Sequence, residues 1–348
     1  MYIKTVVALL CLMILSLEAR VLPAQDMSLQ DLDLTKDNAD EIFDQLEQHG
    51  FSGVVYIKLN QIEELKRPFG MANENLNITN TLTTIFDIGS RPIDFTKASI
   101  LLLDQRQQIS MEDPVSLYFD NVPVDKRSMT IQHLMSGQSG LPDFFHNVSD
   151  WDPDLAWVGR ETALHRILNQ DLLFEPGTDR RHSHGAFGLL AILIEKVSGL
   201  DYFEFLNENF FEPAGMSRTN EYGHTGDLSL SDFAVGGGPH QVGLPNIPPN
   251  WGPTSWLIRG SGGMYSTLDD LLKFYSYVRS TKVLNTNHNY ILKNPSVNLD
   301  GTMRGFELFS AFQPEGSEAY LFLNNIPDMD VAQNLFKDLE ELVFAPGF

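Results

Sequence analysis

The sequence predicts an α/β fold, because strand-like and helix-like segments occur together along one chain. Residues 51–59 are rich in β-branched and aromatic side chains, and residues 306–312 and 320–324 alternate or run apolar like paired strands. Residues 34–48 and 332–342 carry apolar side chains at helical spacing. This combination indicates the α/β (α+β) class.

Length and composition permit one large domain or two smaller lobes. The chain has 348 residues and 43% hydrophobic content, which is enough for a sizeable core. Residues 1–24 are typical of a secretory signal peptide, with Lys4 at the basic start, an apolar run over residues 5–17 and a small-residue cleavage site before Gln25. The apolar run is too short for a membrane span, and no later stretch is long enough for one. We therefore expect a single mature domain at residues 25–348.

The cysteine count and the charge narrow the compartment and the partners. The sole cysteine, Cys11, lies inside the predicted signal, so the mature chain would carry no disulfide and no cysteine-based metal site. An exported protein without disulfides fits a bacterial periplasm or the exterior. The formal net charge is −22, and such an acidic surface repels nucleic acid and anionic membranes. We expect a periplasmic or secreted protein with no nucleic-acid partner.

The N-terminal part is predicted to form a helix followed by two strands. Ile42, Phe43 and Leu46 share one face of the first helix. The strand at residues 51–59 follows, and residues 70–73 indicate a turn after a second strand.

Ser90 lies where an apolar strand-like run ends and a helix begins. A serine can cap that helix, and Pro92 suits its first turn, where a missing N–H has no consequence. The helix is expected to continue through residues 99–107. Because N–H groups at a helix start favour negative charge, this position could stabilise an oxyanion.

The middle of the chain is predicted to be mainly helical. His133 is expected to be a packed histidine on a helix. A further amphipathic helix covers residues 187–197 and ends at Gly199. Residues 236–256 are rich in Gly, Pro and Trp without periodicity, which indicates a long loop over the site.

Ordered motifs along the chain resemble the serine β-lactamase and D,D-peptidase-like family, which includes the class C enzymes and related esterases. The nucleophile segment of that family reads Ser-x-x-Lys followed by Phe-Thr, and Ser90, Phe95 and Thr96 match it. The other matching motifs surround Gly140, Pro176, Glu195, Gly215 and Gly262. The resemblance covers nearly all of residues 35–345.

The resemblance implies a β-lactamase/transpeptidase-like fold, with an antiparallel sheet flanked by helices and an all-helical lobe. The α/β lobe would comprise about residues 35–100 and 260–348, and the helical lobe about residues 101–259. The site cleft is expected between the two lobes, where ligand pockets tend to form.

Three of the four key side chains of the family's site are replaced in this chain. In the family, a Lys accepts the proton of the nucleophilic Ser, a Tyr shares that proton, and a basic residue on a strand steers the anionic substrate. At these positions the chain has Ile93, His182 and Leu299, and His184 stands where the Tyr motif has Asn. Ser90 remains as the expected nucleophile. Loss of a general base alone typically slows turnover by about a hundred- to ten-thousand-fold, so the resemblance implies an impaired site.

The same resemblance implies the remaining parts of the cleft. The backbone N–H groups of Ser90 and Thr302 would form the oxyanion hole. The side of the cleft would be lined by Ile93, His184, Leu299 and Gly301.

Two side chains are alternative proton acceptors for the serine. Lys97 lies four residues beyond the position of the family's lysine, on the same helical stripe, and helical side chains lean toward the helix start. Alternatively, His182 could act as the base for Ser90, oriented by His184 or Asp94.

His182 and His184 also have a spacing that suits a metal ion. Catalytic zinc usually takes three protein ligands, and no third ligand occurs at motif spacing. His133, His146 and His240 could join the pair only through folding. We therefore expect no metal and no cofactor.

Three functional hypotheses follow from the sequence. The first is an exported, catalytically impaired member of this family that binds a small-molecule or peptide-like ligand, or a partner, in the cleft. The second is an active esterase or peptidase-like hydrolase that uses Ser90 with His182 as base. The third is a structural role with no cleft ligand.

Overall fold

The computed structural model describes residues 33–150 and 156–345, so the predicted signal at residues 1–24 and Cys11 lie outside the described part. The strands are β1 (Ser52–Leu59), β2 (Ile62–Phe69), β3 (Met71–Asn73), β4 (Ile78–Thr79), β5 (Phe86–Asp87), β6 (Asn220–Glu221), β7 (Met264–Ser266), β8 (Ser296–Thr302), β9 (Phe306–Gln313) and β10 (Ser317–Asn325). The α-helices are α2 (Ala39–Gln48), α3 (Pro92–Gln105), α4 (Ile131–Ser136), α5 (Arg160–Leu168), α6 (His184–Ser198), α7 (Tyr202–Leu206), α8 (Glu212–Ala214), α9 (Leu268–Arg279) and α10 (Met329–Phe344).

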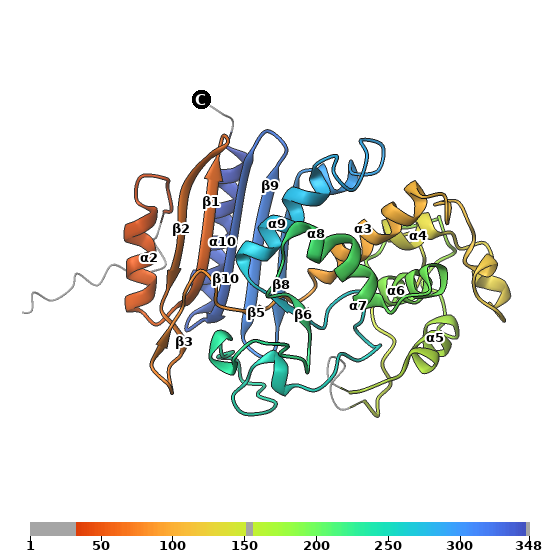
Figure 1. Cartoon of the computed structure of the whole chain (residues 1–348), viewed down its shortest axis with the longest axis horizontal. Coiled ribbons are helices and arrows are strands. Elements are labelled where there is room, and N and C mark those ends of the chain that lie inside the picture. Colours follow the sequence, from red (N-terminus) through yellow and green to blue (C-terminus); the bar gives the residue numbers. More distant parts are fainter. Residues whose placement is uncertain (1–32, 151–155, 346–348) are drawn as a thin grey trace, which may run out of the picture.

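A five-stranded antiparallel sheet in the order β2-β1-β10-β9-β8 organises one part of the molecule (Figure 1). The sheet joins the two ends of the chain, because β1 pairs with β10 along almost its whole length. This confirms the predicted fold class and the predicted strands at residues 51–59, 306–312 and 320–324. A second, three-stranded sheet has the order β5-β7-β6.

The helices α2 and α10 cover one face of the large sheet (Figure 1). Val55 and Ile57 of β1 point to this face and pack with Phe43 of α2 and with Leu335 and Leu339 of α10. Both helices follow from the amphipathic patterns at residues 34–48 and 332–342, although α2 is shorter than its pattern.

The opposite face of the sheet packs on the helical part of the chain. Val54 and Tyr56 alternate with the previous pair along β1, and they belong to a cluster that also holds Phe95 of α3, Leu190 of α6 and Phe274 of α9. The alternation is the period-2 pattern of a strand buried on both faces. One continuous apolar core therefore runs from the sheet into the helices.

The turn predicted over residues 70–73 is shorter than expected. Gly70 alone makes the turn, with a φ of +63°, and a Cβ at this position would lie 2.5 Å from the carbonyl oxygen of Phe51. The next residues form β3, which pairs with β4, with Met71 opposite Thr79. The Met71 N–H donates to Ser52 Oγ, which ties β3 to β1. A short extra hairpin thus replaces the predicted open turn.

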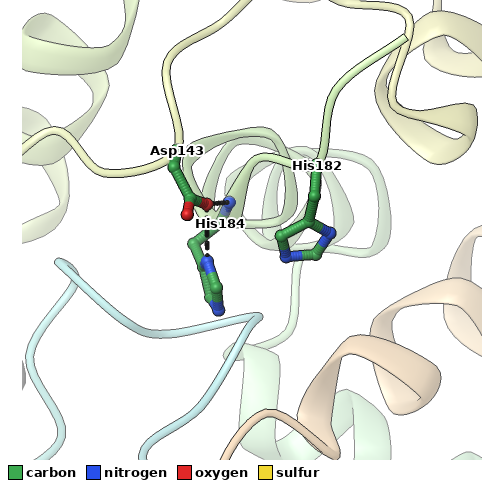
Figure 2. A group of neighbouring side chains, drawn as sticks. All are labelled: Asp143, His182 and His184. Atoms are coloured by element: carbon green, nitrogen blue, oxygen red, sulfur yellow. Dashed lines mark hydrogen bonds and ion pairs between the residues drawn. The ribbon is translucent and has the colours of Figure 1, made fainter. Parts of the chain in front are cut away.

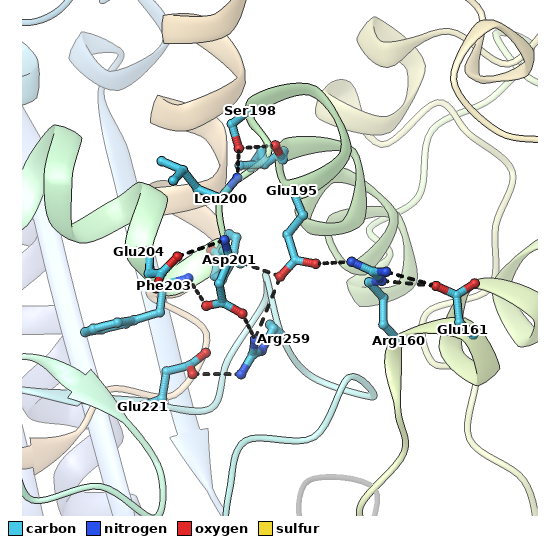
Figure 3. Close-up of polar contacts among 12 residues, drawn as sticks. Arg160, Glu161, Glu195, Ser198, Leu200, Asp201, Phe203, Glu204, Glu221 and Arg259 are labelled. Atoms are coloured by element: carbon cyan, nitrogen blue, oxygen red, sulfur yellow. Dashed lines mark hydrogen bonds and ion pairs between the residues drawn. The ribbon is translucent and has the colours of Figure 1, made fainter.

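Charged side chains, some of them buried, connect the helices to the three-stranded sheet (Figure 3). Arg259 forms ion pairs with Asp201 at 3.1 Å and with Glu221 at 2.7 Å. Glu195 of α6 accepts from Arg160 at 2.8 Å and lies 4.0 Å from Arg259. Three carboxylates therefore surround one guanidinium group.

Candidate active site

Ser90 lies in the tight turn between β5 and α3. Gly89 takes a φ of +51°, and a Cβ on it would lie 3.1 Å from the Cβ of Asp300 in β8, so glycine allows the turn and the close approach of that strand. The prediction that Ser90 caps the helix is wrong. The helix begins at Pro92 after Arg91, with no side-chain cap, and the Ser90 hydroxyl faces α6 instead.

The Ser90 hydroxyl and two other side chains form a hydrogen-bonded chain. Ser90 Oγ lies 3.3 Å from Nε2 of His184, and Nδ1 of His184 lies 2.7 Å from Oδ1 of Asp143 (Figure 2 shows the last two residues). A carboxylate only accepts, so the proton of a neutral His184 ring lies on Nδ1. The free lone pair of Nε2 then faces the serine, which is the arrangement a general base requires.

The start of α6 fixes His184 in this position. Ser183 caps the helix, since its Oγ accepts from the Ala186 N–H at 3.1 Å and donates to the Pro142 carbonyl at 2.7 Å. The N–H of His184 donates to Asp143 Oδ1 at 3.1 Å, so the same carboxylate oxygen holds both the backbone and the ring of this residue. The Phe144 ring stacks on the imidazole, with centroids 4.5 Å apart and planes 12° apart. The histidine is thus held by the cap, the carboxylate and the aromatic ring.

The other predicted proton acceptors lie elsewhere. His182 lies beside His184, with ring centroids 4.7 Å apart, and no hydrogen bond joins it to Ser90 among the described residues. Burial lowers the pKa of His182, and the nearby His184 adds to this effect. Lys97 forms an ion pair with Asp94 at 3.1 Å. Ile93, at the family's lysine position, is buried in the core.

A pocket of about 340 Å³ opens beside Ser90 and His184. Its rim is apolar and exposed, with exposed fractions of 56% for Leu299, 68% for Met303 and 38% for Phe144. The pocket is lined by Gly89, Ser90, Phe144, His184, Tyr222, Ile258, Ser261, Gly262, Gly263, Leu299, Asp300, Gly301, Thr302 and Met303.

The loop predicted to cover the site contributes nothing to this lining. Residues 236–256 are irregular apart from the 3-10 turn Pro248–Asn250, and none of them lines the pocket. Trp251 packs on Tyr222 and Phe306 instead.

A larger hollow of about 420 Å³ lies between α5 and α6, but its lining holds no Ser, Thr or Cys nucleophile.

Strand β8 brings the predicted cleft residues Leu299 and Gly301 and the predicted oxyanion residue Thr302 to the pocket. Gly301 and Thr302 line it, and a Cβ on Gly301 would lie 2.3 Å from the carboxylate oxygens of Glu307. The backbone N–H of Ser90 has no acceptor among the described residues, so it is available to a bound oxyanion. An oxyanion held by a backbone N–H is stabilised without reorganisation.

A buried ion pair joins β8 to the turn that carries Ser90. Arg91 donates to Asp300, to Ser310 Oγ at 2.9 Å and to the Tyr275 hydroxyl at 3.3 Å. That hydroxyl donates in turn to Asp94 at 2.8 Å. Burial acts to raise the pKa of Asp94, but Lys97 and Arg91 hold this pKa below its ordinary value. The carboxylate of Asp94 therefore binds Tyr275 and Lys97, and it does not orient His182.

Sequence reasoning missed Asp143. This residue ends the Gly-Leu-Pro-Asp segment of a recognised motif, but only the fold brings the segment against α6, where the Gly185 N–H donates to the Asp143 carbonyl at 2.9 Å. Asp143, His182 and His184 form the one group of three His, Cys, Asp or Glu side chains close enough to share a metal ion within the described ranges. The group does not include the other histidines considered from the sequence (His133, His146 and His240).

No helix of the described part is long and apolar enough to cross a membrane.

Comparisons with known proteins concern the family and the fold of the chain. The sequence matches the Beta-lactamase family over residues 39–308. A penicillin-binding protein of Bacillus subtilis is 29% identical over 241 residues, which cover 66% of this chain and 52% of that relative, so the match spans about half the relative's length. The fold is similar to that of a beta-lactamase/D-alanine carboxypeptidase from Yersinia pestis, with a TM-score of 0.71, 17% identity and coverage of 89% of this chain and all of that one. It is also similar to a penicillin-binding protein from Bacillus halodurans, with a TM-score of 0.65, 24% identity and coverage of 83% and 96%.

Proposed function

Because this chain belongs to the beta-lactamase family, we propose that it is a serine hydrolase in which a histidine and an aspartate replace the family's proton acceptors. Ser90 is the nucleophile, His184 the general base and Asp143 the group that orients the base. The observation that carries this proposal is the chain of contacts from Ser90 Oγ through His184 to Asp143, at 3.3 and 2.7 Å. The first distance is long for a hydrogen bond to a hydroxyl, and such contacts often tighten when substrate binds.

The reaction is acyl transfer in two steps. Ser90 Oγ attacks the substrate carbonyl carbon while its proton passes to His184 Nε2, and the N–H groups of Ser90 and Thr302 hold the oxyanion. His184 then gives that proton to the leaving alcohol or amine, which departs and leaves an acyl-serine. A water molecule, deprotonated by His184, hydrolyses the acyl-serine and restores the enzyme. Asp143 keeps the Nδ1 proton in place and stabilises the imidazolium in both steps.

The apolar pocket rim supports an uncharged acyl group as substrate. Leu299 replaces the residue that attracts an anionic group in the family, and Met303 and Phe144 extend the apolar surface. A carboxylate at this rim would lose water without gaining a cationic partner. We propose esters or amides of uncharged, apolar acyl groups as the substrate class.

Labelling with a fluorophosphonate, read by intact mass, tests the mechanism. The wild type is expected to gain one adduct and to hydrolyse p-nitrophenyl butyrate, and Ser90→Ala is expected to do neither. His184→Gln should slow both reactions by about a hundredfold or more, as expected for loss of a general base. His182→Gln and Lys97→Gln are the matched comparisons, because the same loss in either would assign the base to that residue.

The competing hypothesis is an impaired cleft that binds a ligand or partner without turnover. Two replacements support it: Ile93 stands where the family has its proton-accepting lysine, and Leu299 stands where the family has a basic residue that attracts the substrate. A folded wild type that neither labels nor hydrolyses the ester would favour this hypothesis and contradict the hydrolase.

Export is part of the proposal. The basic start, apolar run and cleavage site within residues 1–24 support a secretory signal. Expression in a bacterium and mass measurement of the extracytoplasmic product is expected to give a chain that begins at Gln25. A product that keeps residues 1–24 and stays in the cytoplasm would contradict export.

A further inference from the structure

Asp143, His182 and His184 offer one ligand atom each, and these three atoms all lie within 4.8 Å of one another (Figure 2). Two imidazoles and one carboxylate are a ligand set that zinc takes with a fourth position open. We propose that these three residues bind Zn²⁺ reversibly, and that the bound ion switches off the serine. The binding depends only on the three side chains, whereas its effect on turnover rests on the proposed function.

The cluster must contract slightly to hold the ion. Zinc bonds to nitrogen and oxygen are about 2.1 Å long, so neighbouring ligand atoms in a tetrahedral site are about 3.4 Å apart. His184 is the fixed ligand, because its side chain is only 17% exposed and stacks on Phe144. The Asp143 side chain is 47% exposed and His182 is exposed, so side-chain rotation can bring both toward His184. The fourth position of the ion is left to water.

Zinc on His184 removes the base whichever ring nitrogen it takes. A metal on Nε2 occupies the lone pair that accepts the Ser90 proton. A metal on Nδ1 displaces the proton held by Asp143, and the neutral ring then carries its proton on Nε2, which faces Ser90 as a donor. Inhibition therefore follows from the chemistry of imidazole and does not depend on the exact position of the ion.

The selection of zinc follows from the ligand types. Imidazole suits zinc, copper and nickel, whereas magnesium and calcium prefer sets made of oxygen ligands alone. Calcium and magnesium at millimolar concentration are therefore expected neither to bind the cluster nor to slow the enzyme.

Isothermal titration of the EDTA-treated mature protein (residues 25–348), which lacks Cys11, with ZnCl₂ tests the binding. The wild type and Ser90→Ala are expected to bind one zinc ion with equal affinity, because Ser90 is not a ligand. His182→Ala should bind at least about tenfold more weakly, since even indirect partners of a metal contribute that much. His49→Ala is the matched control, because His49 is an exposed histidine at the end of α2 and is expected to leave binding unchanged.

Ester hydrolysis in zinc buffers tests the switch. Each variant's rate with zinc is divided by its own rate in EDTA. The wild-type ratio is expected to fall at least tenfold and to recover when EDTA is added, and the His182→Ala ratio is expected to stay near one. Equal zinc affinity in the wild type and His182→Ala, or a wild type that zinc accelerates, would overturn the proposal. If the wild type binds zinc but does not react with the fluorophosphonate, the result would support the metal site and contradict only the proposed hydrolase activity.

Discussion

The position of the proposed base, His184, shows how little sequence spacing constrains where a general base can come from. A general base must reach the serine oxygen, and it can do so from any element that passes nearby. In the family the base comes from one helical turn beyond the serine, and here that position holds the buried Ile93. His184 reaches Ser90 from α6, far along the sequence, so a motif centred on Ser90 cannot reveal it.

The choice between His182 and His184 depends on where α6 begins. The sequence predicts a helix from residue 187, which leaves both histidines in a loop, and of the two His182 is the expected base, with His184 as a group that could orient it. The Ser183 cap starts the helix at His184 instead, and this fixes the ring between Asp143 and Ser90. His184 was predicted as a cleft residue and as a group that could orient His182, and its proposed role as base rests on the positions of the cap and of the Asp143 loop.

Leu299→Lys is expected to change substrate preference toward anions. A cation at this exposed rim position should attract a carboxylate on the acyl group by about 1 kcal/mol, or roughly fivefold in kcat/KM. The measurement compares hydrolysis of two p-nitrophenyl esters of equal length, one neutral and one with a terminal carboxylate. Leu299→Gln is the control for polarity without charge. An unchanged preference in Leu299→Lys would show that this position does not face the acyl group.

At the scale of elements, the ion pair between Arg91 and Asp300 connects α3 to β8. The two side chains are 4% and 12% exposed, so removing one partner leaves a buried, uncompensated charge. Ser90 directly precedes Arg91 in the turn before α3, and Thr302 lies on β8 with Asp300, so the pair joins the two segments that carry the proposed oxyanion donors.

Arg91→Met is expected to destabilise the fold by about 3–5 kcal/mol, the usual effect of breaking a buried ion pair. Urea unfolding followed by circular dichroism gives this free energy. The double variant Arg91→Met with Asp300→Leu should recover most of the loss, because neither charge is then left unpaired. A single variant within 1 kcal/mol of the wild type would mean that water solvates Asp300.

A second element-scale prediction concerns the carboxylates around Arg259. Burial raises the pKa of Glu221 from 4.5 to about 7, although the Arg259 charge opposes the shift. The folded state therefore holds this proton more tightly than the unfolded chain does. The contribution of Glu221 to stability is fully present below about pH 4.5 and is lost as the pH rises through about 7. This contribution of Glu221 to the free energy of unfolding is about 3 kcal/mol.

Glu221→Gln is expected to remove this part of the pH dependence. The free energy of unfolding of the wild type should fall more steeply than that of the variant between pH 4.5 and 7, and urea titrations at several pH values give both curves. Glu340→Gln, an exposed change on α10, is the control. Parallel curves for the wild type and Glu221→Gln would show that Glu221 is ionised across this range.

The elements that the sequence predicts well are those whose own residues show a periodic pattern of apolar side chains. The alternation along β1 and the apolar stripes of α2 and α10 appear directly in the sequence, because burial on a sheet or helix imposes a period. The hairpin of β3 and β4 and the Asp143 contact carry no such period. The hairpin is tied to the large sheet by a hydrogen bond between Asn80 and Asn324, and the Asp143 contact likewise joins segments distant in sequence, so only the folded chain shows them.

At the scale of the whole molecule, the sheet and the helical part share one apolar core. Phe95 is a fully buried member of it, with its ring 5.1 Å from Phe211 and 4.6 Å from Phe274. Side chains of β1 and of α6 belong to the same cluster. The lobes predicted from the sequence are therefore not separated by a layer of polar residues in the part of the chain that the structure describes.

Shared core packing predicts that the mature chain unfolds in one transition. If one lobe unfolded alone, it would expose the apolar surface that it covers on the other lobe. Unfolding of a single lobe is therefore unfavourable. Scanning calorimetry should give one peak whose van't Hoff and calorimetric enthalpies agree. Phe95→Ala is expected to destabilise the protein by about 3–5 kcal/mol and to move that single peak to lower temperature. If Phe95→Ala instead split the peak, with one part still unfolding at the wild-type temperature, that result would show that the two lobes unfold independently. In that case the shared core could not hold Ser90 against His184, and only the local hydrogen bonds of the Asp143 loop would keep the two residues in contact.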